Sequence, residues 1–192
     1  MRNLIVGCLL TLDGVHEAPR NWAGPFFDAA AAQESLEQLN RSDAMLMGRN
    51  TYEYFASAWP YESGPYPDRV NAIRKYVFSS TLQRAEWNNA VLIDEDPVSA
   101  VRRLKREGDG DLVIYGFGRL SHALLARDLV DEVRLTIYPV LQGGGETMPR
   151  LGGVPTRLSL VSVERSESGV VSLDYRKPGS GTRTTEREAP RT

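Results

Sequence analysis

The sequence is poor in the residues that build disulfides and metal sites. It has one cysteine and two histidines among 192 residues. A single cysteine cannot form an intramolecular disulfide, and these three side chains are too few for a typical structural zinc site. Cys8 lies inside the apolar run 4–10, which is typical of a small buried side chain. We therefore expect neither a disulfide nor a bound metal.

Long apolar runs and a strong charge of one sign are also missing. No apolar stretch approaches the roughly 20 residues that span a bilayer. The first apolar run is followed directly by Asp13 and Gly14, which is unlike the cleavage site of a signal peptide. The 23 basic and 25 acidic residues are interspersed, without the basic patch that binds nucleic-acid phosphates. These features predict a cytoplasmic protein that binds neither membranes nor nucleic acid.

Short apolar runs alternate with helical segments along the chain. We predict strands at 2–10, 44–47, 75–78, 91–93, 112–115 and 131–141, and helices at 26–39, 48–58, 97–107 and directly after 118. Residues 157–163 and 169–176 are predicted to form a hairpin, and the Pro- and Tyr-rich stretch 59–68 a loop. The pattern predicts a three-layer α/β fold with a mostly parallel central sheet, flanking helices and an antiparallel C-terminal hairpin. One domain would span residues 1–177, followed by a disordered tail over 178–192.

Glycine-rich or hydroxyl-rich turns follow three of the predicted strands. Gly116-Phe117-Gly118 joins a strand to a helix, which allows backbone N–H groups to approach a pyrophosphate. Gly48-Arg49 has the same layout, and an arginine can pair with a phosphate. Ser79-Ser80-Thr81 offers three hydroxyls at a third strand end. Each turn alone has a purely structural alternative, but their joint occurrence at the carboxyl ends of strands indicates a phosphate-bearing ligand.

Together with Leu12-Asp13-Gly14, these motifs resemble the dihydrofolate reductase superfamily. The nearest branch is the one with the C-terminal reductase domain of riboflavin-biosynthesis (RibD) deaminase-reductases, which the segments 129–133 and 139–145 also resemble. The resemblance covers roughly residues 2–176 and implies a dihydrofolate reductase-like fold, NADPH as cofactor and a homodimer. The residues that it places at the cofactor are Thr11, Leu12, Gly14, Gly48, Arg49, Thr51, Tyr52, Ser79, Ser80, Thr81, Tyr115, Gly116, Phe117, Gly118, Arg119 and Leu120.

The reaction that the resemblance implies is hydride transfer from NADPH to a small pyrimidine- or pterin-like heterocycle. Asp13 is the first candidate proton donor and Asp28 the second, with bound water as a third source; Asp-Gly is also a common turn pair. Trp22, Phe26 and Trp59 are predicted to contact the substrate, with packing at the edge of the core as the alternative.

Two departures from the family pattern bear on the substrate. Dihydrofolate reductases carry a pterin-binding acid in the helix before the Gly-Arg motif, and neither Asp28 nor Glu34 stands clearly in that place. A zinc deaminase needs more cysteines than this chain has. The first departure counts against folate as the substrate. Two alternatives nevertheless stay open: a protein that binds NADPH without turnover, as a sensor or regulator, and a strict dihydrofolate reductase.

Overall fold

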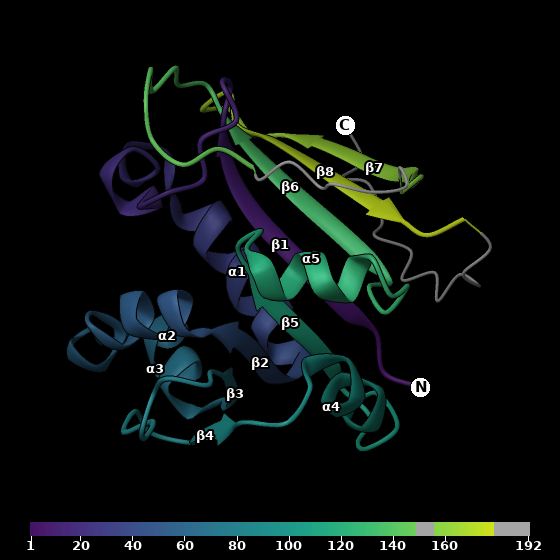
Figure 1. The fold of residues 1–192 in the computed structure, drawn as a ribbon. Helices are drawn as coiled ribbons and strands as arrows, with labels where there is room; N and C mark the ends of the chain where they lie inside the picture. The colour runs from purple at the N-terminus through teal and green to yellow at the C-terminus, as the bar shows by residue number, and fades with distance from the viewer. Residues whose placement is uncertain (149–155, 179–192) are drawn as a thin grey trace.

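The computed structural model describes residues 1–148 and 156–178, which form one sheet covered by helices (Figure 1). The strands are β1 Leu4–Thr11, β2 Ser42–Gly48, β3 Arg74–Phe78, β4 Ala90–Ile93, β5 Asp111–Tyr115, β6 Glu132–Tyr138, β7 Ser159–Arg165 and β8 Val171–Arg176. The helices are α1 Ala29–Arg41, α2 Arg49–Ala56, α3 Pro65–Ala72, α4 Pro97–Leu104 and α5 Arg119–Leu125. Short 3-10 turns occupy Pro19–Asn21, Gly24–Phe26 and Trp59–Tyr61.

The eight strands are ordered β4-β3-β2-β5-β1-β6-β8-β7. Pairing is parallel from β4 through to β6, and β8 and β7 add to β6 as antiparallel strands. The predicted fold class is thus confirmed, including the C-terminal hairpin. Because the central strands are parallel, their carboxyl ends reach the same edge of the sheet.

The two faces of β1 are packed differently. Leu4, Val6 and Cys8 belong to the core that includes side chains of α4 and α5, and α5 lies in front of the sheet in Figure 1. Burial raises the pKa of the Cys8 thiol to about 12, so the thiol stays protonated at neutral pH. Ile5 and Gly7 point to the opposite face, where they line a pocket described below. The pocket thus lies mainly on this second face of the sheet.

The stretch 59–68 differs from its predicted loop. A 3-10 turn begins at Trp59, and α3 begins at Pro65 and continues to Ala72. Pro65 occupies the first turn, where its missing N–H leaves no helical bond unmade. Gly64 precedes the helix with a φ of 123°, a conformation that suits glycine. The prolines and the glycine, which suggest a loop, therefore start a helix here.

Two predicted boundaries also shift, and one prediction cannot be compared. The first helix begins at Ala29 rather than 26, because the Asp28 carboxylate accepts a hydrogen bond from the Ala31 N–H and caps it. The predicted strand 131–141 ends at Tyr138. The predicted tail 178–192 lies outside the described residues, except for Pro178.

Lys75 is a fully buried cation at the start of β3. Its ammonium group donates hydrogen bonds to the backbone carbonyls of Asn71 at 2.8 Å, Ile73 at 2.8 Å and Asn88 at 3.1 Å. It also lies 4.3 Å from the centre of the Trp87 ring. One side chain thus ties the end of α3 to the loop that leads into β4. Burial lowers the pKa of Lys75 to about 8, and the nearby charge of Arg69 adds to the effect.

We expect the stability of the protein to rise with pH because of Lys75. Below about pH 8 this lysine is charged in the folded and unfolded chains, so the folded state bears the full cost of burying the charge. Between about pH 8 and the ordinary value of 10.5, the folded lysine loses its proton while the unfolded one keeps it. The free energy of unfolding relative to a Lys75→Met variant should therefore rise by up to ~3 kcal/mol over this window. Urea unfolding of both proteins at several pH values measures it, and a constant difference would contradict the lowered pKa.

Candidate functional site

The carboxyl ends of β2, β3 and β5 bring the predicted phosphate-binding turns to one edge. Gly48 at the end of β2 pairs in register with Phe78 at the end of β3. Beyond these ends, the Arg49 Nη1 donates a hydrogen bond to the Thr81 Oγ1 at 2.9 Å. The Arg49 Nε also pairs with Glu53 at 2.7 Å, one helical turn further along α2. The exposed Arg49 side chain thus connects the turn after β2 to the turn after β3.

Four predicted cofactor-binding glycines leave open space beside their backbones. A Cβ atom added to Gly14, Gly48, Gly116 or Gly118 would have no other heavy atom within 4 Å. Gly116 has a φ of 92°, so a side chain at this position would also be strained. The Gly14 and Gly116 N–H groups already donate to the carbonyls of Thr11 and Gly7, so a pyrophosphate would meet the N–H groups at the starts of α2 and α5, beside Gly48 and Gly118. The residues present therefore fit a dinucleotide cofactor.

Other predicted cofactor residues have structural roles in their turns. The Ser79 hydroxyl accepts hydrogen bonds from the Thr81 and Leu82 N–H groups, at 3.2 and 3.0 Å, and so shapes the turn after β3. Phe117 is buried in the core, so only its backbone can meet a ligand. The Tyr52 side chain is also buried, and its hydroxyl accepts a hydrogen bond from the Trp87 N–H at 3.1 Å.

The remaining members of the predicted set lie at the same edge with varied exposure. Thr51 lies in the first turn of α2, Arg119 begins α5, and Leu120 packs against the core. Ser80 is exposed after β3, and Leu12 is exposed after β1. Their contacts with the cofactor stay predictions.

Asp13 holds the turn after β1 against a distant loop. Its carboxylate accepts hydrogen bonds from the Thr11 hydroxyl at 2.5 Å and from the N–H groups of Gln142 at 3.2 Å and Gly143 at 2.8 Å. These donors, the Thr11 hydroxyl foremost, lower the pKa of Asp13 to about 2. The carboxylate is therefore ionised at neutral pH and has no proton to give. This geometry favours a structural role for Asp13 in its turn, which is the alternative that the Asp-Gly pair suggests.

A pocket of about 590 Å³ lies between α1 and the open face of the sheet. Its floor is formed by β1, β5, β6 and β8, its roof by α1, and its aromatic side by α2, the turn at Trp59 and the start of α3. The floor residues from these strands are Ile5, Gly7, Cys8, Leu9, Val113, Tyr115, Arg134, Thr136, Tyr138 and Ser172, and Val170 lines the pocket directly before β8. The floor includes Tyr115, the residue directly before Gly116, so the pocket adjoins the glycine turn of the predicted cofactor site.

The aromatic end of the pocket is a chain of four rings in contact. Phe55 stacks on Tyr115 with 6.0 Å between ring centres, and meets Trp59 edge-on at 6.1 Å. Trp59 in turn meets Tyr66 at 5.3 Å. The Arg20 guanidinium, which also lines the pocket, lies 5.1 Å from the centre of the Trp59 ring. Flat, apolar walls of this kind suit a planar ring.

The other end of the pocket is polar. Arg134 of β6 is held by the Gln38 side chain and by Glu132, with Asp174 of β8 at 3.6 Å. Arg176 also pairs with Glu132 at 3.1 Å. These pairs occupy much of the Arg134 guanidinium, so the polar end is a fixed network of ion pairs.

The predicted substrate contacts are only partly brought to this pocket. Phe26 and Trp59 line it, as does Asp28 from the start of α1. Trp22 instead lies in a small separate core, where its indole packs on Tyr138 at 5.3 Å and donates to the Glu17 carbonyl at 3.0 Å. The sequence reasoning did not identify Gln38, Arg134 or Ser172. Polar residues alternate with apolar ones in the strand 131–141, and this alternation could have identified Arg134.

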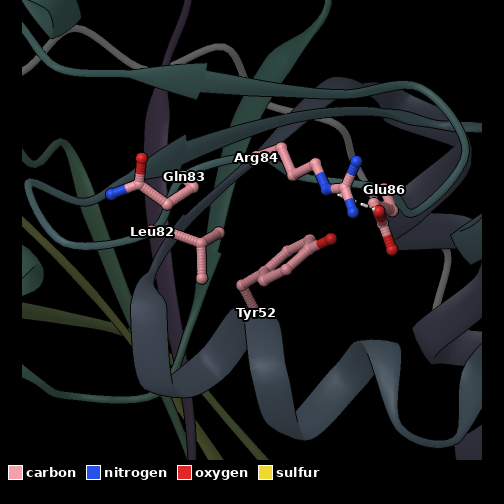
Figure 2. A pocket seen from close by; sticks show the side chains of 5 residues that line it. All are labelled: Tyr52, Leu82, Gln83, Arg84 and Glu86. Atoms are coloured by element: carbon pink, nitrogen blue, oxygen red, sulfur yellow. Dashed lines mark ion pairs between the residues drawn. The ribbon is translucent and has the colours of Figure 1, made fainter.

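A second, smaller hollow of about 330 Å³ lies beside α2 (Figure 2). Figure 2 shows Tyr52 pointing from the helix toward an exposed ion pair of Arg84 and Glu86. The Arg84 Nε and the Glu86 Oε1 are 2.7 Å apart. Leu82 and Gln83 complete its wall. The Tyr52 side chain lines this hollow and not the larger pocket.

Within residues 1–148 and 156–178, no helix has both the length and the apolar character that crossing a membrane requires. Within the same ranges, no three His, Cys, Asp or Glu side chains gather as metal ligands would.

Known proteins are similar to this chain in sequence and in fold. The RibD C-terminal domain family matches residues 2–172. The uncharacterized protein YyaP of Bacillus subtilis is 30% identical over 181 residues, which cover 91% of this chain and 94% of that protein. The uncharacterized protein YwjB of the same organism is 29% identical over 103 residues, which cover 54% of this chain and 56% of that protein.

Two solved structures have the same fold at lower identity. A protein of Shewanella sp. PV-4, provisionally named a riboflavin biosynthesis protein, has a TM-score of 0.72 at 22% identity, over 91% of this chain and 98% of its own. A diaminohydroxyphosphoribosylaminopyrimidine deaminase/5-amino-6-(5-phosphoribosylamino)uracil reductase of Thermotoga maritima has a TM-score of 0.63 at 18% identity, over 92% of this chain and 56% of its own. With the family match over nearly the whole chain, these likenesses confirm the resemblance found in the sequence, and the chain belongs to the RibD C-terminal domain family.

Proposed function

We propose that this chain is an NADPH-dependent reductase that transfers a hydride to a small, planar, pyrimidine-like heterocycle. The observation that carries the proposal is the adjacency of two sites at the end of β5. Tyr115 forms the floor of an aromatic pocket, and Gly116, the next residue, opens the glycine turn suited to a pyrophosphate. The Thermotoga relative is named as a reductase of a substituted uracil, which supports a pyrimidine-like substrate here.

The residues that would hold NADPH are those of the exposed turns. Arg49 and Thr81 would bind the 2′-phosphate, and the N–H groups of Gly118 and of the first turn of α5 would bind the pyrophosphate. The chemistry that the cofactor supplies is a hydride for an electrophilic carbon. The chain's own contribution is to orient the substrate between aromatic walls and to keep water away from it.

The proton that accompanies the hydride needs a source other than Asp13, because this carboxylate is already ionised and bound by the turn. Asp28 lines the pocket, and one of its oxygens caps α1. We propose Asp28, or a water that it orders, as the route for the proton.

A strict dihydrofolate reductase stays as the second candidate because of one observation. Asp28 and Glu34 both line the pocket from α1, which the sequence alone did not indicate. Tight binding of methotrexate would favour this candidate, and its absence would leave the pyrimidine-like substrate. Consumption of NADPH with such a substrate separates either reductase from a protein that only binds the cofactor.

We expect the protein to bind NADPH more tightly than NADH. Replacing Arg49 with Gln should weaken NADPH binding by about 10- to 100-fold, because a charge-assisted hydrogen bond to the 2′-phosphate is lost. Binding of NADH, which lacks this phosphate, should change little. Quenching of tryptophan fluorescence and the thermal shift at saturating nucleotide measure both affinities.

Arg103→Gln is the matched control for this experiment. Arg103 forms a similar ion pair with Glu107 four residues later, but it lies in the last turn of α4, before β5 begins, whereas the glycine turn follows the end of β5. The Arg103→Gln variant should leave the affinities for NADPH and NADH unchanged. Equal affinity for the two nucleotides in the natural protein would contradict the assignment of the 2′-phosphate site.

Asp13→Asn should reduce thermal stability at neutral pH but not at acid pH. The pKa of this carboxyl is lowered, so its stabilising effect is complete above about pH 4 and is lost as the pH falls toward 2. The difference in Tm between the natural protein and the variant should therefore shrink over this window. Carboxyl chemical shifts recorded by NMR report the pKa of Asp13 directly, and a value near or above 4 would restore it as a candidate acid.

We also propose that a second copy of the chain covers the outer part of the sheet, as the family resemblance implies. Leu160, Val161 and Val163 of the edge strand β7 are 53%, 50% and 57% exposed. Val163 pairs in register with Leu173, which pairs with Leu135, so an apolar surface continues across β8 to β6. Among the described helices, none lies over β7 and β8 on the side of α5 in Figure 1. An uncovered apolar face of this kind marks an interaction site.

Val163→Glu should therefore weaken self-association by at least ~10-fold, because a charge would be buried without a partner. Analytical ultracentrifugation measures the dissociation constant. Leu141→Glu is the control, since Leu141 is 74% exposed but lies outside this surface. A natural protein that is monomeric at high concentration would contradict the proposal.

A further inference from the structure

The floor of the pocket carries two hydroxyl groups that are open to a ligand. Thr136 of β6 and Ser172 of β8 both line the pocket, and they lie opposite each other in the antiparallel pairing of these strands. Among the residues that the structure describes, neither hydroxyl has a hydrogen-bond partner, and neither is sealed from solvent. Residues opposite each other in such a pair have Cβ atoms about 5 Å apart, so one ligand group can meet both hydroxyls.

Comparable hydroxyl side chains of the sheet are bonded within the protein. The buried Ser42 hydroxyl donates to the Gln38 carbonyl at 2.9 Å. Ser162, on the neighbouring strand β7, donates to the Asp174 carboxylate at 3.1 Å. The two pocket hydroxyls are therefore not held by the fold, and water satisfies them until a ligand takes its place.

The hydroxyl pair lies some distance from the aromatic end of the pocket. Tyr115 is in register with Gly7 of β1, and Gly7 is in register with Arg134 of β6. Thr136 follows Arg134 by two residues and so lies on the same face of the sheet. Because adjacent strands are ~4.8 Å apart, the backbone at the hydroxyl pair is roughly 10–15 Å from that of Tyr115. A single six-membered ring against the aromatic wall does not span this distance, but a ring with a short side chain does.

The charged groups near the hydroxyl pair favour an uncharged ligand group. Glu164 of β7 lies in register with Ser172 and also lines the pocket. The Arg134 guanidinium, the nearest cation on β6, is paired with Glu132 and lies 3.6 Å from Asp174. An anion at the hydroxyl pair would therefore approach the Glu164 carboxylate without a free partner from Arg134. A ligand hydroxyl suits this place better, because it can both donate to and accept from a serine or threonine hydroxyl.

We propose that Thr136 and Ser172 bind an uncharged, hydroxylated side chain of the substrate, while the aromatic end of the pocket holds its ring. This inference rests on the proposed function and deepens it, because it assigns a second subsite to the same pocket and names the group that this subsite takes. A side chain of CH₂ groups alone would displace the water from both hydroxyls without replacing its hydrogen bonds, so the pocket discriminates against it.

Three ligands with the same 6-aminouracil ring test the assignment. The 6-amino group carries a propyl chain in the first and a 2,3-dihydroxypropyl chain in the second, and the third is the phosphate ester of the second. The diol should bind to the natural protein about 3- to 10-fold more tightly than the propyl compound, as expected for the added hydrogen bonds. The phosphate ester should bind no more tightly than the diol. Calorimetric titrations without a nucleotide and with saturating NADP⁺ measure the three affinities.

Ser172→Ala and Thr136→Val each remove one hydroxyl with little change of shape. Each variant should reduce the preference for the diol over the propyl compound by at least ~2-fold, and the double variant should abolish it. The affinity for the propyl compound should not fall, whereas an effect on packing alone would weaken both ligands equally. The Tm of the free variants should stay the same, because neither hydroxyl has a partner within the described protein.

Ser162→Ala is the matched control. It also removes a hydroxyl from this part of the sheet, but that hydroxyl is bonded to Asp174, and Ser162 does not line the pocket. This variant should lower the Tm of the free protein and leave the preference for the diol unchanged.

Equal affinity of the natural protein for the diol and the propyl compound would overturn the proposal, and so would a failure to bind any of the three ligands. Tighter binding of the phosphate ester would also overturn it. The subsite would then take an anion, with Arg165, which lines the pocket at the end of β7, as the cation to replace next.

The outcome is separable from that of the proposed reductase activity. A preference for the diol that depends on Thr136 and Ser172 supports this inference even if no NADPH is consumed. Preference for NADPH over NADH, with equal binding of the diol and the propyl compound, would support the proposed function and overturn this inference alone.

Discussion

The parallel pairing of the central strands is the constraint on which the rest of the structure depends. It carries the ends of β1, β2, β3 and β5 to one edge of the sheet, although they are far apart in the sequence. The Arg49–Thr81 hydrogen bond and the open glycine turns exist only because these ends meet. The pairing of these strands thus brings together the turns that follow β2, β3 and β5. The same register sets which side chains of β1 face the α4–α5 core and which face the pocket.

The pocket exists because the side chains on one face of the sheet are too small or too polar to fill it. Gly7 leaves room above β1, and Thr136 and Ser172 on the neighbouring strands are short. Arg134 is long but is held down by Glu132 and Gln38. On the opposite face, aliphatic side chains from α4 and α5 close the gap completely. The sheet is therefore packed against helices on one side and forms the floor of the pocket on the other.

Local patterns in the sequence predicted the strands, the fold class and the turns at the carboxyl edge, because buried strands and strand-to-helix turns have characteristic short sequences. The predictions failed where tertiary contacts decide the conformation or the position of a residue. Pro65 and Gly64 suggest a loop but begin α3, and Trp22 has the same local appearance as Trp59 but packs in a core. The polar end of the pocket joins Gln38 to Arg134, 96 positions apart, and no local pattern relates them. The role of Asp13 in its turn likewise depends on N–H groups about 130 positions away.

Lys75 has a consequence for chemical reactivity. The chain has three lysines, and two of them, Lys75 and Lys105, are buried, whereas Lys177 is partly exposed. Amine-reactive reagents require an accessible, uncharged amine, so Lys177 and the N-terminus would react first. Lys75 can react only when the contacts between α3, β3 and the loop before β4 open. Its rate of modification therefore measures how often this edge of the sheet opens in the native protein.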